Sequence, residues 1–164
     1  RRGIAYTIDV VILFAVLAPF AFLVEWGLAI DPASGVQIWM AAVLSFSLPA
    51  WTYFALSDWS VGGATLGKRL LKIRVVKDDS PEKLSLGRAV GRTAVKLLPW
   101  EIVHTFGFAL IGVVPEWVQM GGLVVSNVLL IVYLGVAAVT HGRKSVHDFV
   151  VGTAVERQTH LQKS

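Results

Sequence analysis

The stretch Trp117–Thr140, WVQMGGLVVSNVLLIVYLGVAAVT, decides the class of fold. It contains no charged side chain, and it is longer than the roughly 20 apolar residues that a helix needs to cross a bilayer. The whole chain has the same character, because 55% of its residues are hydrophobic and only 16% are charged. These proportions exclude an ordinary soluble domain and indicate an all-α integral membrane protein.

Three other apolar segments precede this stretch. Ile4–Trp26 and Val36–Leu56 are each long enough to span a bilayer as a helix. Leu97–Val114 is shorter and is interrupted by a proline, a glutamate and a histidine, so both a full crossing and a re-entrant path stay open. The sequence therefore predicts about four transmembrane helices.

The basic residues fall on one side of this predicted bundle. All 15 Lys and Arg residues lie before the first apolar segment, between the second and the short one, or after the last. The loops Glu25–Gln37 and Pro115–Glu116 contain acids and no base. Because Lys and Arg are retained on the cytoplasmic side, we expect a multi-pass protein with both termini in the cytoplasm. The net charge of +4 then indicates contact with the lipid bilayer and its anionic head groups, and no nucleic acid partner.

The predicted central cytoplasmic loop is rich in basic residues. LLKIRVVK at 70–77 contains β-branched residues and is followed by the turn signal DDSP at 78–81, which predicts a short strand or hairpin. Ser85 is positioned to cap a helix through LGRAVGRTAVKLL at 86–98. We expect an interfacial helix whose basic face contacts lipid phosphates, the alternative being an ordinary solvated face. The residues of that face recur every four positions: Arg88, Arg92 and Lys96.

The stretch GGATLGKRLL at 62–71 has the glycine and lysine spacing of a phosphate-binding loop. Arg69 follows Lys68 where such a loop needs a Ser or Thr hydroxyl for magnesium, and an apolar segment precedes it where a strand is needed. We therefore predict no nucleotide partner. The chain has no cysteine and no spacing typical of a metal site. We expect no metal, no cofactor, no catalytic residue and no enzymatic activity.

Four motifs in order resemble those of the RDD family of small bacterial integral membrane proteins. They are RGIAYTID at 2–9, GATLGKRLLKIRVVK at 63–77, LSLGRAVGRTAVKLL at 84–98 and HDFVVGTAV at 147–155. The resemblance implies an RDD-type membrane domain over residues 1–155, a polar C-terminal tail over 156–164, and a location in the bacterial inner membrane.

The charged residues within these motifs allow two interpretations. Asp9 lies two helical turns from Arg2, and a carboxylate at this depth needs a partner. The structural interpretation is an ion-pair cluster that ties the termini to the central loop, formed by Arg2, Asp9, Lys68, Arg69 and Asp148. The functional interpretation is a candidate ion pathway formed by Asp9, Glu101 and His104.

Two functions follow from these interpretations. The first is a non-enzymatic accessory or stabilising subunit of a larger membrane assembly for lipid or solute transport, with other membrane protein subunits as partners. The alternative, which the family resemblance implies for some members, is a self-contained ion or solute transporter such as a sodium/proton antiporter.

Overall fold

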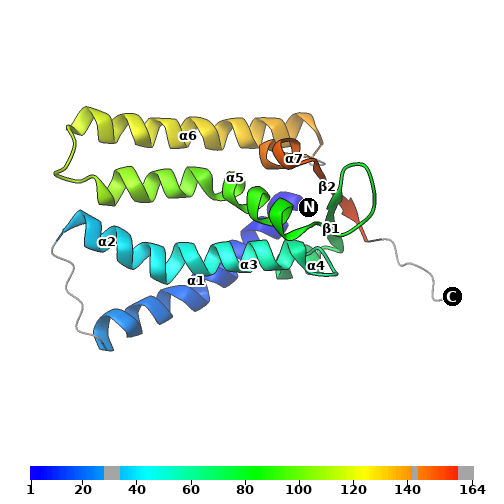
Figure 1. Cartoon of the computed structure of the whole chain (residues 1–164), viewed down its shortest axis with the longest axis horizontal. Coiled ribbons are helices and arrows are strands. Elements are labelled where there is room, and N and C mark those ends of the chain that lie inside the picture. Colours follow the sequence, from blue (N-terminus) through cyan, green and yellow to red (C-terminus); the bar gives the residue numbers. More distant parts are fainter. Residues whose placement is uncertain (28–33, 142–143, 159–164) are drawn as a thin grey trace.

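The computed structural model describes residues 1–27, 34–141 and 144–158, and it consists of long helices with a small sheet at one end (Figure 1). The helical elements in chain order are α1 (Arg2–Gly27), α2 (Gly35–Ala42), the π-helical turn η1 (Val43–Ser47), α3 (Leu48–Trp59), α4 (Leu66–Leu70), α5 (Leu86–His104), the π-helical turn η2 (Thr105–Ala109), α6 (Glu116–Val139) and α7 (Val146–Val151). The strands are β1 (Ile73–Lys77) and β2 (Thr153–Arg157).

Three helical segments are long and apolar enough to cross a membrane: Arg2–Leu23, Gly35–Trp59 and Glu116–Val139. In each of them, at most 22% of an 18-residue apolar stretch is buried inside the protein. Large apolar side chains therefore cover the outside of the bundle, as in Phe22 and Ile131, which are 66% and 68% exposed. Such a surface requires a hydrocarbon environment, because a protein in water rarely exposes large continuous apolar patches.

The segment Gly35–Trp59 is one helix that widens in the middle. Pro49 has no N–H and its ring crowds the preceding turn, so regular α-helical bonding is interrupted there. The π-helical turn η1 accommodates this interruption, and the Leu48 N–H donates to the Val43 carbonyl, five residues back. The chain crosses the proline without a break between α2 and α3.

The structure corrects the prediction that the basic helix and the short apolar segment are separate elements. Both belong to α5 and η2, which lie beside α6 (Figure 1). Pro99 leaves the Val95 carbonyl without its usual helical donor, and the Tyr133 hydroxyl of α6 donates to that carbonyl at 2.6 Å. Ser126 of α6 also donates to the Pro99 carbonyl at 2.7 Å. Side chains of α6 thus satisfy the polar groups around the proline and allow α5 to continue.

The strand predicted in LLKIRVVK is present as β1, but a local hairpin is not what it forms. β1 pairs antiparallel with β2, from Ile73 opposite Arg157 to Lys77 opposite Thr153. Val75 of β1 forms a small buried apolar cluster with Leu84 and Ala89. Local turn signals could not identify a partner from the other end of the chain, and β2 includes the first two residues of the predicted tail.

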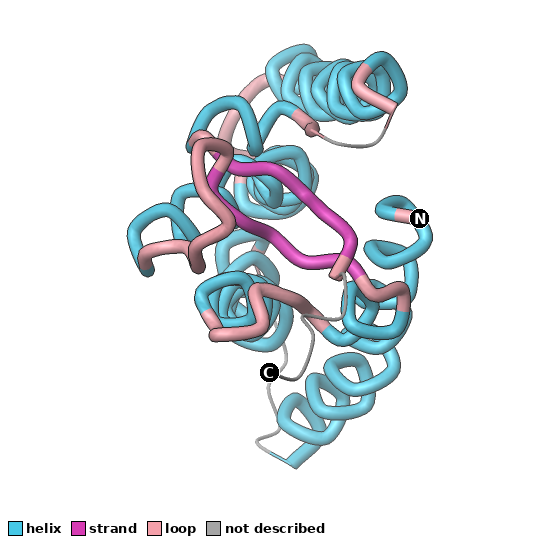
Figure 2. The backbone as a smooth tube through the Cα atoms, turned by 90° about the vertical axis from the view of Figure 1, so that its right-hand side faces the viewer, coloured by secondary structure: helices cyan, strands magenta, loops and turns pink. Residues whose placement is uncertain are grey.

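One end of the bundle, which we call the polar end, contains α4, α7, the sheet and the start of α1 (Figures 1 and 2). There the predicted cap forms, with the Ser85 hydroxyl accepting from the Arg88 N–H at the start of α5. Segments that are distant in sequence meet at this end, so it is where tertiary contacts decide the structure.

Gly67 sets how closely α4 approaches α1. A Cβ atom at Gly67 would lie 2.1 Å from the carbonyl oxygen of Ala5, which is far inside van der Waals contact. The two backbones can meet here only because residue 67 has no side chain. The GKR motif, residues 67–69 of the stretch that resembles a phosphate-binding loop, therefore contributes its glycine to the packing of α4 against α1.

We predict that Gly67→Ala lowers the free energy of unfolding by about 1–3 kcal/mol, since the added methyl group forces α4 away from α1. Thermal unfolding of the purified protein in mild detergent measures this change. Gly3→Ala is the matched control, because a Cβ at Gly3 meets nothing within 4 Å. Equal stability of the two variants would contradict the proposed close contact.

Candidate functional site

Asp9 is fully enclosed at the polar end and is held by neutral donors. It accepts hydrogen bonds from the Tyr53 hydroxyl at 2.7 Å, the Thr65 hydroxyl at 2.6 Å and the Gly67 N–H at 2.8 Å. The Gly67 N–H is available because the first turn of a helix leaves its N–H groups without intrahelical acceptors. The sequence predicted a cationic partner for Asp9. That prediction is wrong, because hydroxyl and amide donors satisfy this carboxylate.

Arg92 of α5 bridges two aspartates from other helices. Its Nη1 atom donates to Asp58 at the end of α3, and its Nε and Nη2 atoms donate to Asp148 of α7 at 3.0 Å. Arg92 is 1% exposed, and both aspartates are fully buried. Asp58 also accepts from Lys68 Nζ of α4 at 2.5 Å. Four helices are thus connected through one buried network of ion pairs.

Arg2 brings the start of α1 into the same network. Its guanidinium pairs with Asp148 and donates to Nε2 of His147 at 2.5 Å. Because arginine can only donate, Nε2 of His147 must carry a lone pair and the imidazole is neutral. Burial lowers the pKa of His147 to about 2, which agrees with the neutral ring.

The carboxylate of Asp148 is held from several directions. It accepts from the Ser145 N–H at 2.8 Å and from the Thr153 hydroxyl at 3.0 Å, in addition to Arg92 and Arg2. Burial by itself would raise the pKa of Asp148, but the two guanidinium groups hold that pKa well below its usual range. Asp148 is therefore ionised at neutral pH and anchors α7 and β2 to the bundle.

Lys68 is a buried cation of the same network. Burial lowers its pKa to about 8, while the charge of Asp58 opposes that change. At neutral pH the ammonium keeps its proton, so its ion pair with Asp58 is intact. The lysine of the GKR motif thus has a carboxylate as its partner, where a phosphate-binding loop would present it to a nucleotide.

The other predicted site residues differ from one another in their burial and in their partners. Arg69 is exposed and donates to the Ala64 carbonyl at 3.1 Å, and within the described ranges it has no ion pair with an acid. The predicted lipid-phosphate face is wrong at Arg92, because this side chain is enclosed between two aspartates. Arg88 is exposed and Lys96 is half-buried. Helical spacing placed the three on one face but could not show that neighbouring helices cover part of it.

Glu101 and His104 form a second polar group farther along α5. The Ser47 hydroxyl donates to Glu101 at 3.2 Å and is 3.2 Å from Nδ1 of His104. The indole N–H of Trp51 donates to Glu101 at 3.0 Å. These contacts join α5 to η1 and α3. Asp9 has its own separate set of partners, so the structure does not bring the three residues of the candidate ion pathway into contact.

Sequence reasoning missed Asp58, which is central to the network. A signal for it was present, because Asp58 is the only acidic residue between Ser34 and Lys77 and it stands at the end of an apolar segment. Its importance depends on Lys68 and Arg92, whose proximity only the folded chain shows. Tyr53 and Thr65, the hydroxyl donors to Asp9, were also missed and carry no distinctive sequence pattern.

The apolar helices and the buried ion-pair network together define the chain as a helical membrane protein stabilised at one end by charges. The sequence model of the RDD family matches residues 1–152. The chain therefore belongs to the RDD family. No curated protein and no solved structure matches it.

We predict that Asp58→Asn lowers the free energy of unfolding by about 3–5 kcal/mol, because it leaves Lys68 and Arg92 buried without one of their counterions. Unfolding of the purified protein by graded denaturing detergent measures the loss. The control is Asp78→Asn, which breaks the more exposed pair with Lys144 and should change stability by less than about 1 kcal/mol.

Adding Lys68→Met to Asp58→Asn should recover part of the loss, since it removes one uncompensated cation. If Asp58→Asn were no more destabilising than Asp78→Asn, the network would not have the structural role assigned to it.

Proposed function

We propose that this RDD protein is a non-enzymatic accessory subunit that stabilises a larger membrane assembly. In the proposed arrangement α5 and η2 form a fourth crossing beside α6, and the polar end faces the cytoplasm of a bacterial cell. The distribution of Lys and Arg supports this orientation. The side-by-side course of α5 and α6 supports the fourth crossing (Figure 1).

The outward face of α6 is the observation that carries the accessory role. Gly121 and Gly135 lie on this face, and a Cβ at either position meets nothing within 4 Å. Between them, Val124 and Val128 are more than half exposed. In membranes, small residues on a helix allow another helix to approach closely. By contrast, a Cβ at Gly122 would lie 2.1 Å from the Phe106 ring, so that glycine serves packing inside the chain.

We predict that partner subunits co-purify with the tagged protein in mild detergent and that Gly121→Leu combined with Gly135→Leu releases them. The bulky side chains would prevent close approach at α6 while leaving the internal network untouched. Gly87→Leu is the control, because Gly87 is also open but lies near the polar end of α5. A wild-type protein that purifies in mild detergent as an isolated chain would contradict the accessory role.

A second candidate, an ion transporter, is favoured by one observation. Asp9 lines a cavity of about 60 Å³ within the polar end, together with Lys68, Lys96 and four other residues. A larger cavity of about 540 Å³ shares Lys96, Tyr6 and other lining residues with it. Together the two cavities place space for solvent beside a carboxylate within the bundle, which is a common feature of proton and cation sites in membranes.

If the chain transports sodium or protons by itself, purified protein in liposomes should move them, and Asp9→Asn should abolish the flux. The control is Asp79→Asn, which changes an exposed carboxylate in the loop after β1 and should leave the flux unchanged. Flux that survives Asp9→Asn in a correctly folded protein would exclude this mechanism.

A further inference from the structure

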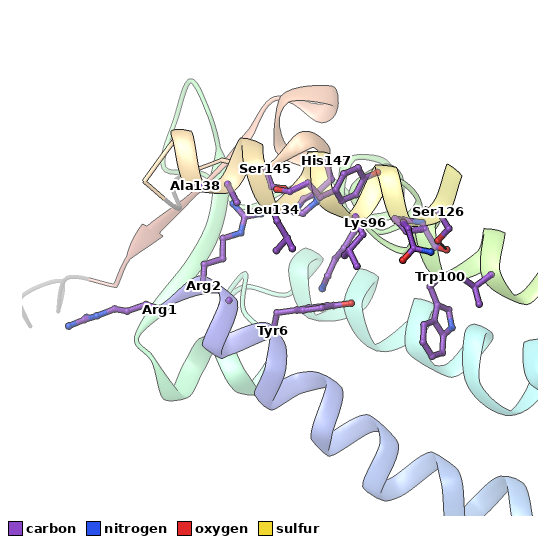
Figure 3. A pocket seen from close by; sticks show the side chains of 17 residues that line it. Arg1, Arg2, Tyr6, Lys96, Trp100, Ser126, Leu134, Ala138, Ser145 and His147 are labelled. Atoms are coloured by element: carbon purple, nitrogen blue, oxygen red, sulfur yellow. Dashed lines mark hydrogen bonds between the residues drawn. The ribbon is translucent and has the colours of Figure 1, made fainter. Parts of the chain in front are cut away.

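The cavity of about 540 Å³ lies between α1, α5 and α6 and has the size of many small-molecule sites, which range over roughly 300–1,000 Å³ (Figure 3). It extends from Arg1, Arg2 and Ser145 at the polar end to Val103 and Ser126 farther along the bundle. Between Ser126 and Ala138 of α6 this corresponds to about 18 Å of helix. The cavity is therefore elongated along the direction of the apolar helices.

The charges that line this cavity are of one sign. Arg1, Arg2 and Lys96 line it, and no aspartate or glutamate does. Arg2 already pairs with Asp148. In the part of the chain that the structure describes, Lys96 has no carboxylate within ion-pair distance. Its ammonium lies 3.1 Å from the ring centre of Phe54 and 4.7 Å from that of Tyr6.

The excess of positive charge extends to the small cavity beside Asp9. Four basic side chains, Arg2, Lys68, Arg92 and Lys96, line the small cavity beside Asp9. The three carboxylates near them are Asp9, Asp58 and Asp148. The aromatic rings stabilise the Lys96 ammonium only in part, since a cation–π contact contributes about 0.5–2 kcal/mol. No carboxylate of the described residues pairs directly with Lys96, although Asp58 and Asp9 act on it from farther away, so an anion bound in the cavity would be its direct counterion.

The remaining walls of the cavity are apolar in effect. The hydroxyl groups of Ser126, Tyr133 and Ser145 are directed to backbone carbonyls of the protein. Leu130, Leu134 and Val103 are among the apolar side chains that complete the lining. Figure 3 shows Lys96 extending toward Tyr6 at one part of the cavity, with Trp100 farther along α5. The cavity thus combines the Lys96 ammonium with a largely apolar lining.

We propose that this cavity binds an anionic phospholipid from the surrounding bilayer, with its phosphate at Lys96 and an acyl chain along α6. The polar end lies where the apolar helices end, so Lys96 is placed near the level of lipid head groups. The exposed Arg1 adds a second positive charge near the same end. This site differs from a basic surface of α5, because Arg88 and Arg92 do not line the cavity.

Native mass spectrometry of the full chain, purified in mild detergent, tests the proposal. Phosphatidylglycerol and phosphatidylcholine with the same acyl chains are added separately, and the bound fraction is measured at each concentration. We expect phosphatidylglycerol to bind about fivefold or more tightly, and Lys96→Gln to remove that preference. Arg88→Gln is the matched control on the same helix and should keep the preference.

Two further variants keep the test decisive if Lys96→Gln folds poorly. Lys96→Arg retains the charge and should retain the preference, whereas Ala138→Phe fills part of the cavity and should reduce binding of both lipids. Preference that persists in Lys96→Gln, or equal binding of both lipids to the wild type, would overturn the proposal. If inorganic phosphate prevented phosphatidylglycerol binding as effectively as a competing lipid does, the site would be one for free anions. That result would also overturn the proposal.

A photoreactive residue at Leu134 identifies the occupant directly in membranes. We expect it to give adducts of lipid mass in the wild-type background, and fewer of them with Lys96→Gln. The same probe at Ile131, which is exposed to a similar extent (68%, against 63% for Leu134) but does not line the cavity, reports the background level of lipid contact. Adducts at Leu134 with a second copy of the chain or with another protein would mean that a protein occupies the cavity, and the lipid assignment would fail.

Discussion

The ion pairs of Arg92 are the interaction on which the rest of the polar end depends. One guanidinium holds Asp58 of α3 and Asp148 of α7, so three helices meet at a single side chain of α5. Removing these charges from water costs several kcal/mol per ion, and mutual attraction with good geometry offsets that cost. Such a network adds little net stability, but losing one member leaves the others uncompensated. Its effect is to specify how the helix ends meet.

Within a membrane this specification is needed, because lipid tails are as apolar as the side chains and burial of apolar surface does not drive helices together. Instead of apolar burial, the chain relies on close backbone contacts and on polar groups to hold its helices together. Gly67 allows α4 to contact the backbone of α1, and the hydroxyls of Tyr133 and Ser126 attach α6 to the carbonyls near Pro99. These interactions position α1, α5 and α6 so that a cavity remains between them.

Arg92 and Lys96 show how position along one helix separates structural from binding roles. The two residues stand one turn apart on α5, yet Arg92 is enclosed by aspartates while Lys96 faces aromatic rings and a cavity. The difference arises from the neighbouring elements, since α3 and α7 supply carboxylates to Arg92, whereas α3 and α1 supply the rings of Phe54 and Tyr6 to Lys96. The lipid site and the ion-pair network are therefore adjacent parts of the same polar end.

By itself, the sequence determined the features that depend on local chemistry. The lengths of the apolar segments, the strand at 73–77 and the Ser85 cap follow from hydropathy, β-branching and a capping hydroxyl, which act over a few residues. Only the tertiary structure decided that β2 pairs with β1, that Asp58 is the partner of Lys68, and that Arg92 is buried. The physical reason is that helical periodicity identifies which side chains share a face, whereas the neighbour covering that face comes from a distant part of the chain.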